Sequence, residues 1–212
     1  MKLILMGAPG AGKGTQAEVI SERFEIPAIS TGSVLRDAIR SGSELGKLAK
    51  SLIDEGQFVP DHVINPVVEA RISLPDCKDG FILDGYPRDL NQVKALEEMG
   101  VVVDKVLYLQ LGDEAIIERL SGRRVCEDCG ETYHVLYQPS SAGERCEKCG
   151  GKLIIRKDDR PETIRERLDI YHEVTYPVVE HYRKQGILVE VDSTGSVEAT
   201  TEQTLRVLED ER

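Results

Sequence analysis

Residues 3–15 read LILMGAPGAGKGT, an apolar run that ends in a glycine-rich turn with one lysine. Such a run, followed by an amphipathic helix, is typical of a strand, a phosphate-binding loop and a helix N-terminus. Backbone N–H groups can converge on phosphate oxygens only where no Cβ obstructs them, and Lys13 adds a mobile positive charge. The stretch therefore predicts a polyphosphate site where the first strand ends.

The loop departs from the general phosphate-loop pattern at one position. The pattern G-x-x-x-x-G-K runs from Gly7 to Lys13, but Gly14 stands where a serine or threonine usually follows the lysine. The hydroxyl arrives one residue later, at Thr15. This shift weakens the expectation that the loop itself ligates magnesium.

The length and composition set limits on the class of protein. The chain has 212 residues, 40% of them hydrophobic and 31% charged, and a formal net charge of −11. These values predict one main domain with a small appended module. No apolar run approaches the roughly 20 residues that cross a bilayer, the first residues read as a strand, and the negative charge opposes non-specific attraction to nucleic acid. We therefore expect a cytoplasmic protein with no membrane and no nucleic-acid partner.

The rest of the chain alternates between strand and helix patterns. In order, it predicts a helix ending near 25, a strand at 26–29, a thin helical excursion over 36–59, strands at 80–83 and 106–111, a long helix from 161, a strand at 187–192 and a charged C-terminal helix. Ser33, Asp61 and Asp113 are the predicted helix N-caps, and Tyr176-Pro177 is expected to kink or interrupt the long helix. The alternation predicts right-handed crossovers and a parallel sheet.

The strand at 80–83 runs into the sequence DGYPR, residues 84–88. Ligand groups of parallel sheets collect at strand ends of this kind. A lone acid there is more often a loop cap, but the presence of a phosphate loop favours a magnesium partner. We expect the Asp84 carboxylate and the Arg88 guanidinium to lie at the rim beside the loop.

Four of the five cysteines follow the spacing C-x2-C-x16-C-x2-C, namely Cys126, Cys129, Cys146 and Cys149. A glycine after each pair permits a tight turn, and the spacing is typical of a zinc ribbon. Four thiolates complete a tetrahedral shell, which predicts a structural metal that staples a module too small to bury its own core. A redox pair or two disulfides are the alternative interpretations. The spacing does not choose among zinc, cobalt and iron.

Zinc ribbons often bind nucleic acid, so a nucleic-acid-binding NTPase is an alternative of a different class. Between Arg123 and Arg160 there are eight basic and seven acidic side chains. Four thiolates with one zinc would add two negative charges. The module therefore lacks the basic surface of a phosphate-backbone binder.

Four motifs together resemble the adenylate kinase family over essentially the whole chain: residues 7–16 (GAPGAGKGTQ), 30–32 (STG), 80–88 (GFILDGYPR) and 122–124 (GRR). Gly14 is ordinary in that family. The resemblance implies a P-loop three-layer α/β fold with a five-stranded parallel sheet. It implies a core of residues 1–29, 60–121 and 160–212, a helical AMP-binding flap at 30–59 and a zinc-ribbon-like lid at 122–159, as in the long-lid, zinc-binding bacterial and archaeal branch.

The resemblance also implies three overlapping sets of site residues. The ATP-binding set is Gly10, Ala11, Gly12, Lys13, Gly14, Thr15, Arg119, Arg123, Thr132, Tyr133 and Gly195. The AMP-binding set is Thr31, Arg36, Gln57, Phe58, Val59, Gly85, Tyr86, Pro87, Arg88, Gln92, Arg156 and Arg167. The catalytic set is Lys13, Asp84, Arg88, Arg123, Arg156 and Arg167, with Asp84 holding magnesium through water. Ser33 stands where the family commonly has an aspartate, so the hydrogen bond of that carboxylate is not carried over.

The activity that the resemblance implies is reversible phosphoryl transfer from MgATP to AMP, giving two ADP. Mg²⁺ would be the cofactor and Zn²⁺ a structural metal. ATP, AMP and ADP would be the partners of a monomer. Another nucleoside monophosphate kinase, or a GTP-dependent AMP kinase, is the nearest alternative. Closure of lid and flap would exclude water from the transferred group.

Overall fold

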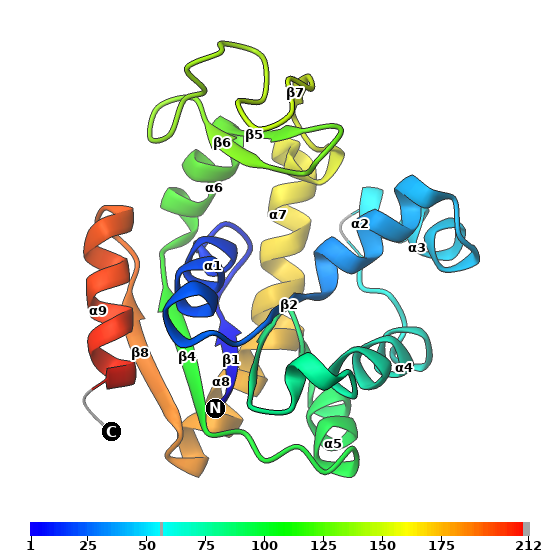
Figure 1. The fold of residues 1–212 in the computed structure, drawn as a ribbon, viewed down its shortest axis with the longest axis vertical. Coiled ribbons are helices and arrows are strands. Elements are labelled where there is room, and N and C mark those ends of the chain that lie inside the picture. Colours follow the sequence, from blue (N-terminus) through cyan, green and yellow to red (C-terminus); the bar gives the residue numbers. More distant parts are fainter. Residues whose placement is uncertain (56, 210–212) are drawn as a thin grey trace.

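The computed structural model describes residues 1–55 and 57–209 and centres on a five-stranded parallel sheet (Figure 1). The strands lie in the order β2 (Ala28–Ser30), β3 (Phe81–Asp84), β1 (Lys2–Met6), β4 (Lys105–Gln110) and β8 (Leu188–Asp192). Every neighbouring pair is parallel, so the predicted parallel sheet is confirmed. The expected flap and core ranges include residues 56 and 210–212, which lie outside the described residues.

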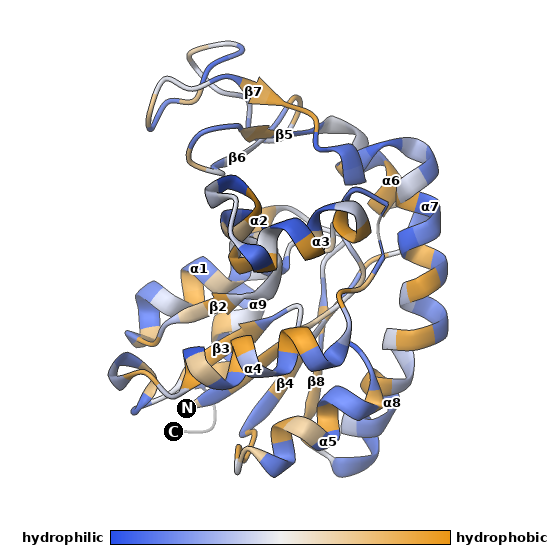
Figure 2. Ribbon diagram, turned by 90° about the vertical axis from the view of Figure 1, so that its right-hand side faces the viewer, coloured by the Kyte–Doolittle hydropathy of each residue, from blue (hydrophilic) through white to orange (hydrophobic). Residues whose placement is uncertain are grey.

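The sheet is buried on both faces because helices cover each of them. Leu3 and Leu5 of β1 pack with α1 (Lys13–Phe24) and α9 (Val197–Glu209). Ile4 and Met6 point to the opposite face, which α4 (Asp61–Ile72), α5 (Leu90–Glu98) and α8 (Tyr176–Gln185) cover. Successive strand side chains alternate between faces, so a strand buried on both faces reads as a continuous apolar run. Figure 2 shows hydrophobic colour along the strands and on the inner sides of the helices.

Two further helices pack together beside the carboxyl ends of the strands. α6 (Asp113–Gly122) and α7 (Pro161–Ile170) share a buried apolar cluster. The residues predicted for one face of the long helix are all buried: Ile164, Leu168, Tyr171 and Thr175. A π-helical segment, η3 (Tyr171–Thr175), separates α7 from α8, directly before Tyr176-Pro177. The predicted interruption is therefore confirmed, and proline, which lacks an N–H, falls in the first turn of α8.

Two smaller parts extend from the core (Figure 1). One consists of α2 (Thr31–Ser41) and α3 (Glu44–Asp54) and is called the flap below. The other holds an antiparallel sheet of β5 (Arg123–Cys126), β6 (Thr132–His134) and β7 (Leu153–Ile154), in the order β6-β5-β7, and is called the lid. Short 3-10 helices occur at η1 (Pro75–Cys77) and, where the lid rejoins α7, at η2 (Lys157–Asp159).

The start of α2 differs from the prediction. Its N-cap is Ser30, whose Oγ accepts a hydrogen bond from the Ser33 backbone N–H at 3.4 Å. Ser33 therefore lies in the first turn as the donor, and its predicted role as N-cap is wrong. The sequence STGS offers a hydroxyl at several positions, and the position at which β2 ends decides which one caps the helix.

Two other predicted caps are also wrong. Asp61 and Asp113 are the first helical residues of α4 and α6, and the N-caps are Pro60 and Gly112. The Asp61 carboxylate instead accepts a hydrogen bond from the Gln92 side chain. Both acids still lie in a first turn, where the helix dipole favours negative charge.

Helix α5 was not predicted from the sequence. Its apolar buried side chains are Val93 and Leu96, too few to give a helical period in nine residues. Asp89 caps it by accepting hydrogen bonds from the N–H groups of Asn91 and Gln92 at 2.8 and 2.9 Å. Among the described residues, no helix has the length and apolar character that a membrane crossing requires.

Candidate active site and metal centre

The loop between β1 and α1 has the backbone that the sequence predicts for a phosphate cradle. Gly7, Gly10 and Gly12 have φ values of +145°, +87° and +97°. A Cβ at Gly7 would lie 2.7 Å from the Leu109 carbonyl oxygen, and one at Gly10 would lie 2.8 Å from Leu120 Cγ. No side chain caps the N-terminus of α1. Its first N–H groups can therefore bind an anion.

Lys13 closes this loop from its far end. Its Nζ donates hydrogen bonds to the carbonyl oxygens of Gly7 at 2.8 Å and Ala8 at 2.9 Å. Burial, opposed by Asp84 and assisted by the neighbouring Arg88, lowers the pKa of Lys13 to about 8. A buried ammonium with neighbouring guanidinium groups gains from an anionic ligand.

The end of β3 lies next to the loop. Leu5 of β1 pairs in register with Asp84 of β3, so the carboxylate reaches the same sheet edge as the loop. Thr31 Oγ1 donates to the Gly85 carbonyl oxygen at 2.9 Å, and Arg88 Nε donates to the same oxygen at 2.7 Å. One carbonyl thus holds the start of the flap and the Arg88 guanidinium together.

A pocket lies between the flap and the ends of β2 and β3. It is lined by Thr31, Leu35, Phe58, Val59, Ile64, Gly85, Arg88 and Gln92. The Arg88 guanidinium carbon lies 5.0 Å from the centre of the Phe58 ring. Gln92 is held on both sides, since its Oε1 accepts from the Arg88 N–H at 2.8 Å and its Nε2 donates to Asp61 at 2.7 Å. Six of the twelve residues predicted for AMP therefore line one pocket.

The other residues predicted for AMP are placed differently. Arg36 donates to Ser33 Oγ at 3.2 Å on the same helix. Gln57 is exposed. Tyr86 is buried, with its hydroxyl 3.0 Å from Asn65 Oδ1, so its side chain belongs to the core. Pro87 lies between Tyr86 and Arg88, outside any helix or strand.

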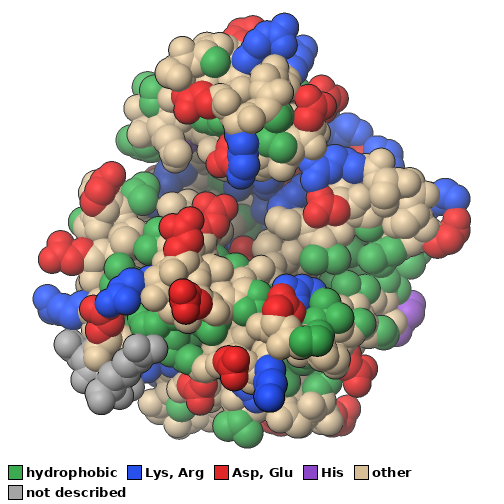
Figure 3. Space-filling model, viewed as in Figure 1, with side chains coloured by type: hydrophobic (Ala, Val, Ile, Leu, Met, Phe, Trp, Pro, Cys, Tyr) green, Lys and Arg blue, Asp and Glu red, His purple; other side chains and the backbone are tan. Residues whose placement is uncertain are grey.

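A group of cations fills the space between the loop, the pocket and the lid. Burial lowers the pKa of Arg88 to about 10 and that of Arg156 to about 9, and burial also lowers the pKa values of Arg36 and Arg167. Repulsion from neighbouring guanidinium groups, Arg123 among them, adds to each shift. Figure 3 shows Lys and Arg side chains in the hollow beneath the lid. Such a cluster is stabilised by a multiply charged anion.

Two acids that the sequence reasoning did not single out, Asp158 and Asp159, pair with arginines of this region. Asp159 is 2% exposed, and its carboxylate accepts hydrogen bonds from Nε and Nη2 of Arg123. Arg167 lies 3.3 Å from the same carboxylate and 3.1 Å from Asp158. The only signal in the sequence is the acidic pair that begins two residues after Arg156, and surface acids are common without such a role.

The residues predicted for the ATP base form a second network. Arg119 donates to the Ser193 carbonyl oxygen at 2.6 Å and to that of Gly195 at 3.4 Å. Ser193 Oγ donates to the Ala11 carbonyl oxygen at 2.7 Å, which ties the 193–195 turn to the phosphate loop. Ser193 was not predicted, because an isolated serine has no pattern of its own.

The lid places Thr132 and Tyr133 on β6. Thr132 is exposed. Tyr133 is buried, with its hydroxyl 3.4 Å from Cys146 Sγ and accepting from the Glu147 N–H at 2.9 Å. The Tyr133 side chain therefore packs with the cysteine cluster. Any contact of Tyr133 with a nucleotide would have to come from its backbone.

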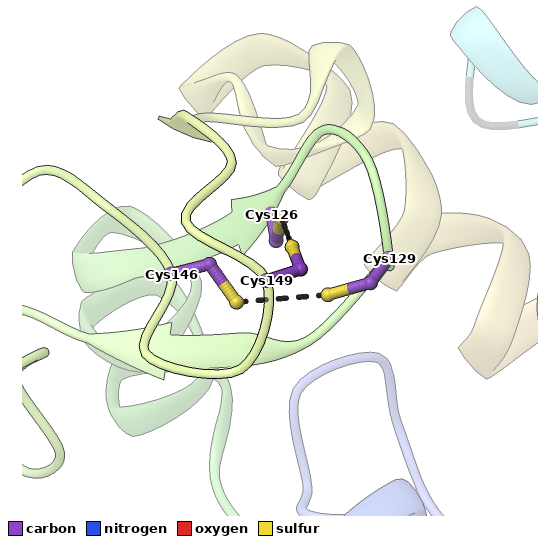
Figure 4. Close-up of side chains that lie close together, drawn as sticks. All are labelled: Cys126, Cys129, Cys146 and Cys149. Atoms are coloured by element: carbon purple, nitrogen blue, oxygen red, sulfur yellow. Dashed lines mark hydrogen bonds between the residues drawn. The ribbon is translucent and has the colours of Figure 1, made fainter.

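The four cysteines of the predicted zinc ribbon converge in the lid (Figure 4). Their sulfur atoms all lie within 4.8 Å of one another. Cys126 and Cys149 are 3.4 Å apart at Sγ, and Cys129 and Cys146 are 3.6 Å apart. Zinc at about 2.3 Å from four tetrahedral thiolates would space them about 3.8 Å apart. The donor set and its geometry fit a closed, structural zinc site.

Comparison with known proteins agrees with these observations. Residues 5–187 match the family model described as adenylate kinase. The chain is 48% identical over 212 residues to an adenylate kinase of Caldicellulosiruptor bescii, covering 98% of this chain and 99% of the relative. It is 46% identical over 213 residues to adenylate kinases of Archaeoglobus fulgidus and Thermodesulfovibrio yellowstonii, with coverage of 98–99% on both sides. The chain belongs to the adenylate kinase family.

Proposed function

We propose that this protein catalyses reversible phosphoryl transfer from MgATP to AMP, giving two ADP. The observation that carries the proposal is the buried cation cluster between the phosphate loop and the pocket at the flap. One nucleotide on each side would bring two phosphate chains together over Lys13 and the arginines. The family model and the relatives that match nearly the whole chain are named adenylate kinase, which supports the same reaction for this protein.

The pocket at the flap is the proposed AMP site. Thr31, Gly85, Arg88 and Gln92 would contact the nucleotide, with Phe58 and Val59 as apolar walls. Arg36 and Arg167 would bind the AMP phosphate. Arg156 Nε is buried and, within the described residues, has no hydrogen-bond partner, so it can donate to a phosphate oxygen. A planar guanidinium can donate two parallel hydrogen bonds to such an oxygen pair.

The loop at residues 10–15 is the proposed ATP phosphate site. Its N–H groups and Lys13 would hold the β- and γ-phosphates, and Arg123 would bind from the lid. Arg119 and the Gly195 backbone would contact adenine, and the backbone of residues 132–133 would contribute from β6. Mg²⁺, when bound with ATP, neutralises phosphate charge, and Asp84 would hold its water ligands.

The transfer needs no general base from the protein. The acceptor is already an anionic phosphate oxygen, so the protein has to align it with the γ-phosphoryl group and neutralise the negative charge. We propose that Lys13, Arg88, Arg123, Arg156 and Arg167 do this together. Closure of the flap (30–59) and the lid (122–159) over the core would keep water from taking the phosphoryl group.

The four cysteines would hold one zinc ion as a structural staple of the lid. The apolar cluster of the lid is small, consisting of Cys126, Tyr133 and Cys146 with Leu153 packed against them. A metal supplies the stability that such a module lacks. Metal analysis of protein purified without chelators should give about one zinc per chain, and its absence would contradict the staple. We further propose a cytoplasmic monomer with no nucleic-acid or membrane partner.

A panel of phosphoryl acceptors tests the proposed reaction. ATP with AMP, CMP, UMP or GMP should give ADP fastest with AMP, and GTP should be the poorer donor. A faster rate with CMP, UMP or GMP would show that the protein is a different nucleoside monophosphate kinase. ATP hydrolysis that depends on RNA or DNA and not on AMP would favour the nucleic-acid-binding NTPase instead.

A further inference from the structure

Arg40 of the flap contacts the lid beside its four cysteines. Its partner there, Asp128, is 88 residues away in the sequence. Its Nη1 donates a hydrogen bond to the Asp128 carbonyl oxygen at 2.9 Å. Nη2 of the same guanidinium pairs with Asp37, three residues earlier on α2. A Cβ built on Gly130 would lie 3.7 Å from Nη1. The guanidinium therefore rests on the turn between Cys126 and Gly130, oriented by its own helix.

The acceptor belongs to the peptide group that joins Asp128 to Cys129. The next residue, Cys129, is a proposed metal ligand. The same turn is closed by a hydrogen bond from the Gly130 N–H to the carbonyl oxygen of Cys126, another proposed ligand, at 3.0 Å. The peptide group that Arg40 contacts thus lies between two proposed metal ligands. A bound metal fixes the positions of these two sulfur atoms, and hence the orientation of the carbonyl between them.

The flap end of the contact leads to the proposed AMP site. Arg40 follows Arg36 by four residues on α2, so the two side chains lie on one face of the helix. The same helix begins at Thr31, which lines the pocket. A hydrogen bond that holds α2 at Arg40 therefore restrains the helix that presents both Thr31 and Arg36.

We propose that Arg40 is a positioning residue that couples metal loading of the lid to closure of the flap over AMP. The proposal rests on the proposed AMP-binding role of the flap. Coupling between two binding sites is reciprocal, so zinc strengthens AMP binding and AMP strengthens zinc binding by the same factor.

Zinc release provides a test that does not depend on catalysis. The full-length, zinc-loaded protein is mixed with excess chromophoric chelator, with and without AMP. In the wild type we expect AMP to slow release about three- to tenfold, the net effect of one hydrogen bond that stays partly exposed to water. Arg40→Ala should lose this slowing, and Arg40→Lys, which keeps one donor, should retain part of it. The matched control is Lys47→Ala, which removes a flap cation paired with Glu44 on its own helix and should behave as the wild type.

Hydrogen exchange and kinetics distinguish this role from a general loss of structure. The Arg40 side chain is 43% exposed, so its replacement should leave the backbone amides of the core as protected from hydrogen exchange as in the wild type. Without nucleotide, α2 amides should be better protected in zinc-loaded than in zinc-free wild type, and Arg40→Ala should abolish the difference. The KM for AMP should rise by a similar three- to tenfold factor, with kcat and the KM for ATP within about twofold.

The outcomes separate the two proposals. Wild-type protein that forms no ADP from AMP overturns the proposed function. A protein that does form ADP, but in which AMP slows zinc release equally in the wild type and in Arg40→Ala, overturns the coupling. So does a wild type in which AMP has no effect on zinc release.

Discussion

At the scale of single residues, Asp159 organises the cations of the candidate site. It is 2% exposed, yet it accepts hydrogen bonds from Arg123 of β5 and from Arg167 of α7. A buried carboxylate is tolerated because both guanidinium groups satisfy it. Each guanidinium keeps other N–H groups for a phosphate, so the acid fixes their orientation without neutralising the site.

Asp159→Asn should reduce kcat by about 10- to 100-fold. The amide cannot accept from both guanidinium groups as strongly, and a charge-assisted hydrogen bond contributes roughly 1.5–3 kcal/mol. Steady-state rates at saturating ATP and AMP measure the effect. Glu162→Gln, an exposed change in the first turn of α7, is the control and should leave kcat unchanged. An unchanged kcat in Asp159→Asn would show that the two arginines are positioned by other contacts.

Arg88→Lys should preserve the fold and reduce turnover by about 100-fold. Arg88 donates to the Gly85 carbonyl oxygen and stacks 5.0 Å from the Phe58 ring centre. Lysine has neither the planar fork nor the stacking face, so it cannot keep these contacts and also bind two phosphate oxygens. Thermal unfolding and turnover are measured on the same preparation. A large fall in melting temperature would assign Arg88 a mainly structural role.

At the scale of elements, the loop and α1 act as one unit. The glycines of the loop lie where the backbone has positive φ or approaches other elements closely, as Gly10 does with Leu120 of α6. Gly14 is different, because a Cβ there would have nothing within 4 Å and its φ is that of a helix. Gly10 and Gly14 therefore have different structural roles.

Gly10→Ala and Gly14→Ala should change stability in opposite directions. At Gly10 the new Cβ would meet Leu120 Cγ at 2.8 Å in a strained backbone, so unfolding should become easier by about 1–3 kcal/mol. At Gly14 alanine is a better helix former, so stability should rise by up to about 1 kcal/mol. Denaturant unfolding monitored by circular dichroism measures both. Equal destabilisation by the two variants would contradict the distinction.

At the scale of the whole molecule, the cation cluster exists only because distant segments meet. Lys13 comes from the first helix, Arg36 from the flap, Arg88 from the end of β3 and Arg156 from the exit of the lid. Burial is the largest cause that lowers the pKa of each, and repulsion from neighbouring guanidinium groups adds to it. The chain carries a net charge of −11, so this positive site is local and depends on the fold.

The pH dependence of catalysis should show this arrangement. Burial lowers the pKa of Lys13 to about 8, so in the free protein its charge is lost as pH rises through about 8. We expect kcat/KM for ATP, which reports the free protein, to fall above pH 8. Bound polyphosphate raises the pKa of Lys13, so kcat should fall only at higher pH. Identical pH profiles for kcat and kcat/KM would contradict this assignment.

Local sequence patterns determined much of the fold. The apolar run at residues 3–6 predicts the first strand, and the strand–helix alternation predicts the parallel sheet that the structure has. The cysteine spacing was enough to predict a four-sulfur cluster, because ligand geometry depends on short turns. Local signals failed at α5 and at the N-caps, where strand ends and long-range partners such as Gln92 decide the outcome.

The sequence by itself determined the phosphate loop from Gly7 to Lys13, the parallel core and the four-cysteine cluster, since each depends on neighbours in the chain. Only the tertiary structure placed Asp159 between Arg123 and Arg167, turned Tyr133 toward the cysteines and set Arg40 against the carbonyl of Asp128. These contacts join residues far apart in sequence, or depend on which way a side chain points within a folded sheet. No local period or motif encodes such contacts, because they arise only when the packed elements bring the partners together.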